Sequence, residues 1–296
     1  MIEVKGLCKS FSDKEVLRDV TVTIDDGRIF GLVGINGAGK STFLRLLSGI
    51  YKVDAGSILF DGEEIYENPK KKNEMFFLPD EPYYDINTTA KSLADFYKVM
   101  YDFNENVYYE FLEKFKLPIK KKIHNFSKGM KRQIFIALAF AIKPKYLFLD
   151  EAFDGLDPLA RLEFKRYIIN LVEDCNTTII ISSHSLRELE DICDCYGLLD
   201  NMVIASQGDI QTALEKVHKY QVAFDRVVEK SEFDISFISF SQDGRIIKVV
   251  CEYSLDEFTK KIKKYNPLII DEIKIDFEEL FIIEVESRGY LQWEIY

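Results

Sequence analysis

The sequence contains no apolar run long enough to cross a lipid bilayer. A spanning helix needs about 20 mostly apolar residues, and the longest apolar stretch, residues 134–142, is bounded by Arg132-Gln133 and by Lys143-Pro144. The start, Met1-Ile2-Glu3-Val4-Lys5, alternates as a strand does and lacks the charged and apolar regions of a secretion signal. We therefore expect a chain that stays in the cytoplasm.

Cysteine is scarce, and its distribution argues against a disulfide framework. Five cysteines are present, an odd number at irregular positions. Cys193 and Cys195 flank Asp194, yet no second cysteine or histidine pair stands at the spacing of a zinc site. We expect reduced thiols and no zinc.

Positive charge is also in short supply. Lysine and arginine number 39 against 50 aspartates and glutamates, a net charge of −11, whereas a nucleic-acid partner requires a basic face or groove. The dense basic runs are Lys70-Lys71-Lys72 and Lys120-Lys121-Lys122, and both are typical of solvated loops. We expect no nucleic-acid partner.

Length and composition are those of an ordinary folded protein. The chain has 296 residues, of which 47% are hydrophobic and 30% charged, and this length exceeds the roughly 100–200 residues usual for one domain. The residue pattern changes after about Asp209. We expect an α/β domain over residues 1–210, with a helical section at about 88–143, and a small α+β domain over residues 211–296.

The first domain alternates strands and helices. Apolar residues at every second position between Ile2 and Ile24 indicate antiparallel strands, and the apolar strand Ile29–Val33 leads through a glycine-rich loop into a helix, Lys40–Leu47. Such strand–helix alternation predicts a buried parallel sheet. The further helices and strands that we expect are Lys91–Tyr101, Val107–Phe115 and Lys128–Ile142, then Tyr146–Leu149 and Thr178–Ser182.

The tail has a different pattern of short strands. Gln242-Asp243-Gly244-Arg245 predicts a hairpin turn. The expected strands are Gln221–Val227, Ile235–Phe240 and Ile246–Glu252, followed by a helix at Leu255–Tyr265, a strand after Pro267 and a last helix at Phe277–Glu286.

The stretch Gly34-Ile35-Asn36-Gly37-Ala38-Gly39-Lys40-Ser41 matches the phosphate-loop pattern GxxxxGK[ST] and stands between a strand and a helix, as that pattern requires. The glycines let backbone N–H groups wrap phosphate oxygens, Lys40 reaches the terminal phosphates, and Ser41 holds Mg²⁺. The sequence therefore predicts ATP and Mg²⁺ as cofactors. The candidate ATP-binding residues here are Asn36, Gly37, Ala38, Gly39, Lys40, Ser41 and Thr42.

Two carboxylates, Asp150 and Glu151, end the apolar run Tyr146-Leu147-Phe148-Leu149. Open α/β sheets bind their ligands at this end of a strand. We expect Asp150 to face Mg²⁺, and Glu151 to accept a proton from, or to orient, the water that attacks the γ-phosphate.

The stretch Asn125–Gln133 resembles the signature of ABC ATPases, and its place before the Asp150 strand is the expected one. The usual signature reads Leu-Ser-Gly-Gly-Gln. Ser127 and Gly129 agree with it, whereas Phe126, Lys128 and Met130 depart from it. Over about residues 1–210 the chain thus resembles the ATP-binding subunits of ABC transporters.

Other positions follow the order of that family. Phe11 matches the aromatic residue that stacks on adenine, Asp157 lies in Gly155-Leu156-Asp157, which matches the loop between the two active sites, and His184 matches the switch histidine. Asp80 stands where the family usually has glutamine, a residue that contacts Mg²⁺ and senses the membrane partner. An aspartate there can approach the metal through water or serve only as a surface turn residue.

The resemblance implies a working assembly. Two ATPase subunits would pair head to tail, as a homodimer, with ATP between the Lys40 loop of one chain and the Ser127 loop of the other, on the cytoplasmic face of the cell membrane. Closure would drive an integral membrane permease subunit. The closing stretch Ile275–Phe281 resembles ATPases of ABC-2 type exporters, among which exporters of antimicrobial or cytolytic peptides, including phenol-soluble modulins, look most similar. The expected cargo is a peptide or small hydrophobic compound.

Two other functions stay open. One is a soluble ABC ATPase of translation or DNA repair, although such chains usually carry two cassettes, long coiled coils or zinc modules. The other is a regulatory cassette without catalysis. The departures at Asp80 and Lys128 leave it possible, whereas the presence of Lys40, Glu151 and His184 argues against it.

Overall fold

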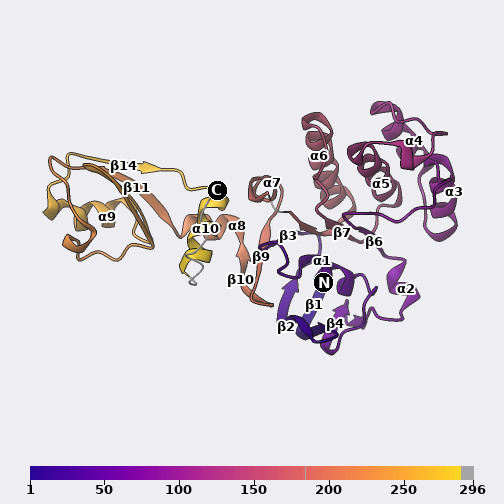
Figure 1. The fold of residues 1–296 in the computed structure, drawn as a ribbon, viewed down its shortest axis with the longest axis horizontal. Coiled ribbons are helices and arrows are strands. Elements are labelled where there is room, and N and C mark those ends of the chain that lie inside the picture. Colours follow the sequence, from indigo (N-terminus) through magenta and orange to yellow (C-terminus); the bar gives the residue numbers. More distant parts are fainter. Residues whose placement is uncertain (184, 288–296) are drawn as a thin grey trace. The chain divides into compact units, whose positions relative to one another are not determined.

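The computed structural model describes residues 1–183 and 185–287 and shows a mixed α/β protein, as predicted (Figure 1). The chain divides into two compact units between Gln207 and Gly208. Among the described residues, two sheets lie in the first unit and one in the second, and each unit has its own hydrophobic core.

A six-stranded sheet forms the centre of the first unit, in the order β10-β9-β3-β8-β7-β6. The neighbours from β9 to β6 are parallel to one another, and β3, β7 and β8 are buried along their whole length. The strands are β3 (Ile29–Val33), β6 (Met75–Leu78), β7 (Tyr146–Asp150), β8 (Thr178–Ser182), β9 (Cys195–Asp200) and β10 (Val203–Asp209).

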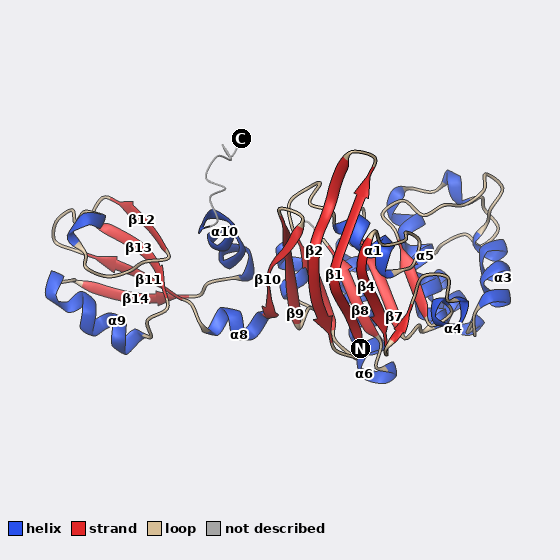
Figure 2. Cartoon of the chain, turned by 90° about the horizontal axis from the view of Figure 1, so that it is seen from below, coloured by secondary structure: helices blue, strands red, loops and turns tan. Residues whose placement is uncertain are grey.

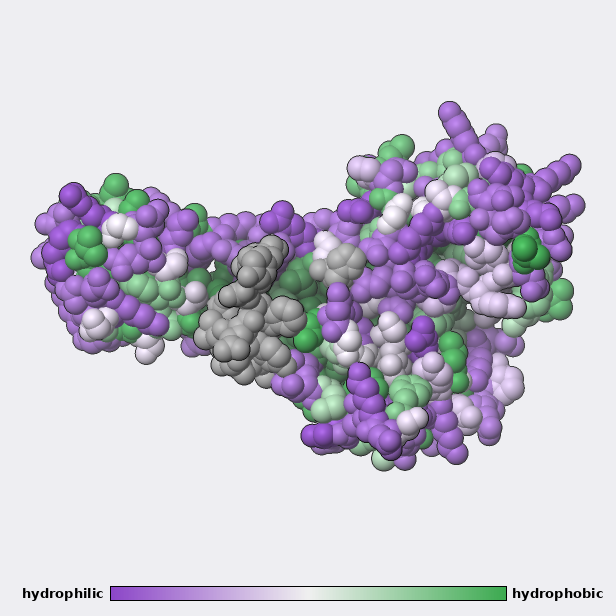
Figure 3. All heavy atoms as spheres, in the orientation of Figure 1, coloured by the Kyte–Doolittle hydropathy of each residue, from purple (hydrophilic) through white to green (hydrophobic). Residues whose placement is uncertain are grey.

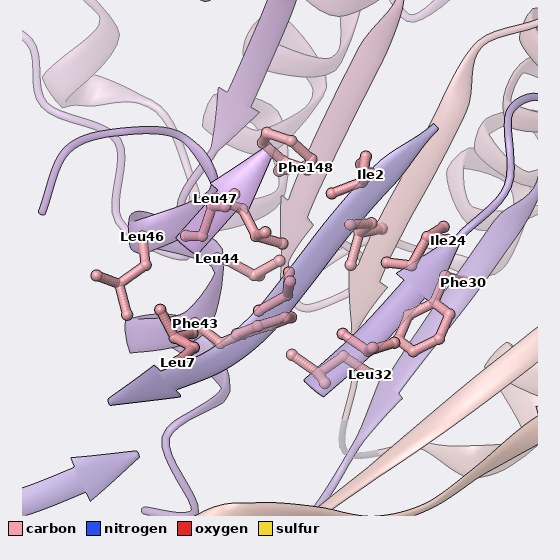
Figure 4. Close-up of a cluster of buried hydrophobic side chains, with 14 of the residues drawn as sticks. Ile2, Leu7, Ile24, Phe30, Leu32, Phe43, Leu44, Leu46, Leu47 and Phe148 are labelled. Carbon is pink, nitrogen blue, oxygen red and sulfur yellow. The ribbon is translucent and has the colours of Figure 1, made fainter. Parts of the chain in front are cut away.

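A second sheet of four strands, in the order β2-β1-β4-β5, contains antiparallel pairs throughout. The close-up in Figure 4 shows the side chains of α1 (Lys40–Leu47) meeting those of β1, β2, β3 and β7 in one buried cluster. The strands are β1 (Ile2–Phe11), β2 (Lys14–Ile24), β4 (Ala55–Phe60) and β5 (Glu63–Glu64).

Helices complete the first unit and follow the predicted pattern closely. The predicted helices Lys40–Leu47 and Lys128–Ile142 have the observed bounds, and the two between them differ by one or two residues. α5 is buried at every position from Arg132 to Ile142. After α1 the helices are α2 (Pro69–Lys72), α3 (Ala90–Met100), α4 (Glu105–Lys114), α5 (Lys128–Ile142), α6 (Pro158–Cys175) and α7 (Leu186–Glu190), with a short 3-10 helix at Ile123–Asn125.

The prediction of a solvated loop at Lys70-Lys71-Lys72 is wrong for Lys71. This residue lies in α2 and is 6% exposed. Its ammonium lies 3.2 Å from a carboxylate oxygen of Asp61 and 3.3 Å from one of Glu74. Glu74 is a near neighbour in the sequence, whereas Asp61 reaches the lysine from the turn after β4.

The second unit is a four-stranded antiparallel sheet, β12-β13-β11-β14, with α9 packed against one face (Figure 2). The ring of Tyr220 stacks on that of Phe258 at a centroid distance of 4.2 Å. The elements are α8 (Ile210–Glu215), β11 (His218–Ala223), β12 (Ser239–Asp243), β13 (Ile246–Cys251), α9 (Leu255–Ile262), β14 (Ile269–Ile273) and α10 (Phe277–Ser287), with short 3-10 helices at Lys230–Glu232 and Lys263–Tyr265.

The predicted hairpin at Gly244 is confirmed, since β12 and β13 pair across it and Gly244 has a φ of 58°. The predicted strand Ile235–Phe240 is wrong over most of its length, because β12 begins only at Ser239. Ile235 is buried in the core of this unit, and Phe237 packs against that core. Their apolar character therefore reflects core packing by a loop.

Within the described residues, no helix combines the length and the apolar character that a bilayer crossing needs. On the face drawn in Figure 3, hydrophilic side chains cover most of the described surface, and apolar side chains form small separate patches.

Candidate nucleotide-binding site

The candidate site residues gather where four neighbouring parallel strands end. β3, β8, β7 and β6 are adjacent and run the same way, so the segments that follow them share one edge of the sheet. These segments carry Gly34, Ser183, Glu151 and Pro79-Asp80. Open α/β sheets bind ligands at this edge.

The loop between β3 and α1 has a backbone that side chains would obstruct. A Cβ on Gly34 would lie 2.4 Å from the carbonyl oxygen of Leu199. Gly39 has a φ of 108°, which L side chains rarely adopt, and a Cβ there would meet the Val16 carbonyl oxygen at 3.2 Å. The loop tip at Ile35, Asn36 and Gly37 is exposed, so its backbone is open to a ligand. Ala38, Ser41 and Thr42 are half-buried beside it.

The side chain of Lys40 folds back over this loop. Its ammonium donates to the carbonyl oxygen of Gly34 at 2.7 Å and to that of Ile35 at 3.3 Å, and the residue is buried. Burial lowers the pKa of the Lys40 ammonium, and the nearby carboxylates of Glu151 and Asp150 oppose that shift. Lys40 is therefore close enough to Asp150 and Glu151 for their charges to interact.

Asp150 is buried at the end of β7. Its carboxylate accepts a hydrogen bond of 2.7 Å from the hydroxyl of Ser182, which ends the neighbouring strand β8. The backbone N–H of Glu151 donates to the carbonyl and to the hydroxyl of Ser182, each at 3.1 Å. Through Ser182, β8 thereby holds the carboxylate of Asp150, the candidate Mg²⁺ ligand, and the backbone N–H of Glu151, the candidate catalytic residue.

The backbone of Glu151 is in the left-handed region, with a φ of 50°. For a residue with a side chain this conformation costs roughly 1–2 kcal/mol. Such backbone strain concentrates at functional sites, where surrounding contacts hold it. The hydrogen bonds on the Asp150–Glu151 peptide are those contacts.

Ser127 and Gly129 lie at the start of α5. The hydroxyl of Ser127 accepts from the backbone N–H of Met130 at 3.2 Å, so Ser127 caps the helix. Gly129 packs on the loop that contains Gly155, because a Cβ on Gly129 would lie 2.2 Å from the Gly155 carbonyl oxygen. Both residues of the signature stretch thus have structural roles within this chain.

We expect Gly129→Ala to destabilise the protein by about 1–3 kcal/mol, because the added methyl group would overlap the Gly155 carbonyl. Helix propensity alone predicts the opposite, a gain of about 1 kcal/mol for alanine over glycine. Urea unfolding of both proteins measures the difference. A more stable variant would contradict the close contact.

The carboxylate of Asp80 is occupied by two cations from α5. It accepts from the guanidinium of Arg132 at 2.7 Å, and the ammonium of Lys128 lies 3.3 Å away. Partial burial raises the pKa of Asp80, but the Arg132 hydrogen bond and the Lys128 charge together hold it below its usual range. Asp80 and Lys128, each of which differs from the residue usual in the family at its position, are therefore ion-pair partners.

The remaining predicted residues lie on other parts of the unit. Phe11 ends β1 and is 40% exposed, with its ring edge-on to Tyr51 at a centroid distance of 5.2 Å. Asp157 caps α6 and accepts from the backbone N–H groups of Leu159 and Ala160. His184, the predicted switch histidine, lies outside the described residues.

Sequence reasoning missed Ser182 and Arg132. Both contact the Asp150–Glu151 pair. Ser182 gives no signal beyond its place at the end of a predicted strand. A signal for Arg132 was present, because it is a charged residue next to the long apolar stretch 134–142, where a helix is expected to be buried.

Comparison with known proteins agrees with this geometry. The family model described as ABC transporter matches residues 17–154. The ABC transporter ATP-binding protein YtrB of Bacillus subtilis is 34% identical over 290 residues, which cover 97% of this chain and 99% of YtrB. The bacitracin transport ATP-binding protein BcrA of Bacillus licheniformis is 31% identical over 289 residues, 94% of each chain.

A solved structure of an ATP-binding subunit of an ABC transporter superposes with a TM-score of 0.66 at 28% identity, over 72% of this chain and 91% of that one. The chain therefore belongs to the family of ABC transporter ATP-binding proteins. Its fold is that of the phosphate-loop ATPases of this family, and membership implies ATP binding and hydrolysis.

Proposed function

We propose that this chain supplies the energy of ATP hydrolysis to export through a separate membrane subunit. The main evidence for ATP hydrolysis is that Lys40, Asp150 and Glu151 come together at one edge of the sheet. The transport part rests on the relatives, one of which is named for bacitracin transport and aligns along 94% of this chain. We propose a peptide or small hydrophobic compound as the cargo of an ABC-2 type exporter.

The residues divide the chemistry among them. The N–H groups of the loop from Asn36 to Ser41 bind the phosphates, together with the start of α1. Lys40 exchanges its two loop carbonyls for phosphate oxygens, which carry more negative charge. Glu151 orients the attacking water and accepts its proton. Phe11, exposed at the end of β1, stacks on the adenine.

The donor set at this edge fits Mg²⁺. The hydroxyl of Ser41 and the carboxylate of Asp150 are the oxygen ligands that this ion prefers, and Asp150 is already oriented by Ser182. Mg²⁺ held there would neutralise charge that develops on the transferred phosphoryl group. We assign Asp80 a different role, developed below, because Arg132 and Lys128 occupy its carboxylate.

We further propose a head-to-tail homodimer on the cytoplasmic face of the membrane, held there by the permease subunit. Ser127 and Gly129 of one chain would approach the phosphates bound at Lys40 of the other. Ser127 is exposed and starts a 15-residue helix, whose N-terminus favours anions. Asp157, in the loop that links the two active sites, would take part in binding ATP, and His184 would act in catalysis as the switch histidine. No nucleic acid takes part.

Co-purification tests the transport role. The full chain is extracted from membranes with a mild detergent, and the integral membrane protein that accompanies it is identified. A polytopic permease supports the proposal. Recovery with ribosomes or DNA-repair proteins instead would show a soluble ABC ATPase.

The dimer has its own test. With Glu151→Gln blocking hydrolysis, Mg²⁺ and ATP should convert the chain from monomer to dimer in sedimentation velocity, because trapped nucleotide links the Lys40 and Ser127 loops. Adding Ser127→Arg should abolish this conversion without preventing ATP binding, because the larger side chain blocks the interface. A monomer under all conditions, for the free chain and for the complex with its membrane partner, would contradict the head-to-tail dimer.

A further inference from the structure

Arg132 connects three segments that the sequence keeps far apart. Its guanidinium donates to the carbonyl oxygen of Pro79 at 3.1 Å, to the carboxylate of Asp80 at 2.7 Å and to the carbonyl oxygen of Asp150 at 3.3 Å. The Arg132 side chain is 1% exposed. We call these four residues the Arg132 bridge.

The Asp150 carbonyl belongs to the peptide group that also contains the N–H of Glu151. Arg132 therefore binds one side of this peptide, and Ser182 binds the other side through the N–H. The two contacts fix the orientation of the peptide plane. That orientation determines where the left-handed Glu151 directs its side chain.

The segment after β6 helps to hold Arg132 in place. A buried guanidinium needs acceptors for its N–H groups, and Pro79 and Asp80 supply two of them. If this segment moves, Arg132 loses partners that set its position against the Asp150 carbonyl. The ammonium of Lys128 strengthens the arrangement, since it pairs with Asp80 at 3.3 Å and with Asp154 at 3.6 Å.

The bridge borders a cavity of about 550 Å³ whose wall includes Asp80, Tyr83, Lys128 and Arg132. Tyr83 is 88% exposed at its rim. The segment after β6 is thus accessible from outside while its carboxylate reaches the buried guanidinium.

We propose that Arg132 is a positioning residue for Glu151 and that Asp80 holds Arg132 in place. The inference rests on the proposed hydrolytic role of Glu151. Asp80 thereby acts through Arg132 instead of through the metal.

The first test is hydrogen exchange on the nucleotide-free full chain, with peptides that cover residues 150–156. Arg132→Lys keeps the charge but cannot span three acceptors, and Asp80→Asn removes the charge of the partner. Both should speed exchange in these peptides about tenfold, because the bonds that hold the peptide weaken. Glu81→Gln, which removes an exposed carboxylate from the next position, should leave exchange unchanged. Unchanged exchange in Arg132→Lys would overturn the bridge.

The second test is steady-state hydrolysis by the full chain with its membrane partner. Arg132→Lys should lower kcat about tenfold and change the KM for ATP less than twofold, because misplacing the catalytic group leaves phosphate binding intact. Asp80→Asn should lower kcat about threefold, and the double variant should be no slower than Arg132→Lys, because both residues act in one chain of bonds.

Three outcomes would overturn the proposal. One is a decrease in kcat that is no larger than the decrease in the fraction of folded protein measured by thermal unfolding. Another is an additive double variant. The third is an Asp80→Asn variant whose kcat recovers at high Mg²⁺, which would make Asp80 a metal ligand. If the proposed function is wrong, the result is different: the parent protein would hydrolyse ATP no faster than Glu151→Gln. The hydrogen-exchange test would still be informative, because it does not depend on hydrolysis.

Discussion

Glu151→Gln should bind ATP as the parent protein does and hydrolyse it about 100 to 10,000 times more slowly, the range typical for loss of a general base. The amide keeps the size of the side chain and the left-handed backbone, which Ser182 holds through the Glu151 N–H. It cannot take a proton from water. Single-turnover hydrolysis and binding of a fluorescent nucleotide measure the two parts separately.

Glu173→Gln is the matched control, because Glu173 is exposed near the end of α6 and its replacement removes the same charge. Parent-like turnover in that variant excludes a general charge effect. Parent-like turnover in Glu151→Gln at saturating Mg²⁺ would show that another group activates the water, and the assignment of Glu151 would then be wrong.

Lys40→Met should weaken ATP binding about 100-fold, because a charged hydrogen bond contributes roughly 1.5–3 kcal/mol. Stability should change much less. The ammonium is buried, so its removal relieves a desolvation cost, while the carbonyls of Gly34 and Ile35 lose a donor. These effects oppose each other, and we expect the free energy of unfolding to change by at most about 1 kcal/mol.

Isothermal titration with ATP and urea unfolding of the same preparations separate binding from stability. Lys120→Met, at an exposed position, controls for the lost charge and should leave both quantities unchanged. A large loss of stability in Lys40→Met with normal ATP affinity in the folded fraction would mean that Lys40 is a structural residue.

Local sequence patterns predicted most of the fold of the first unit. β3, α1, α5 and β8 have the predicted bounds, because continuous apolar strands, helical spacing and the glycine-rich loop are all short-range signals. The tail was harder. Ile235 is buried in the core of the second unit and Phe237 packs against it, both from a loop, so apolar residues there resemble a strand in sequence without forming one.

The family motifs identify the main residues of the candidate site but not the partners of those residues. The prediction for Lys71 is wrong because Asp61, which pairs with it together with the neighbouring Glu74, is identifiable as a partner only in the folded chain. In the sequence, Asp80 and Lys128 are two unrelated departures from the residues usual in the family, and the fold makes them an ion pair.

By itself, the sequence determined the class of this protein, because the phosphate loop, the strand-end carboxylates and the signature stretch are contiguous patterns with fixed chemistry. Only the tertiary structure decided how those patterns act on one another. Arg132 contacts Asp80, which is 52 residues away in the sequence, and Asp150, which is 18 residues away. Their contact depends on the register of parallel strands and on the burial of α5, which are properties of the whole sheet and not of any one segment.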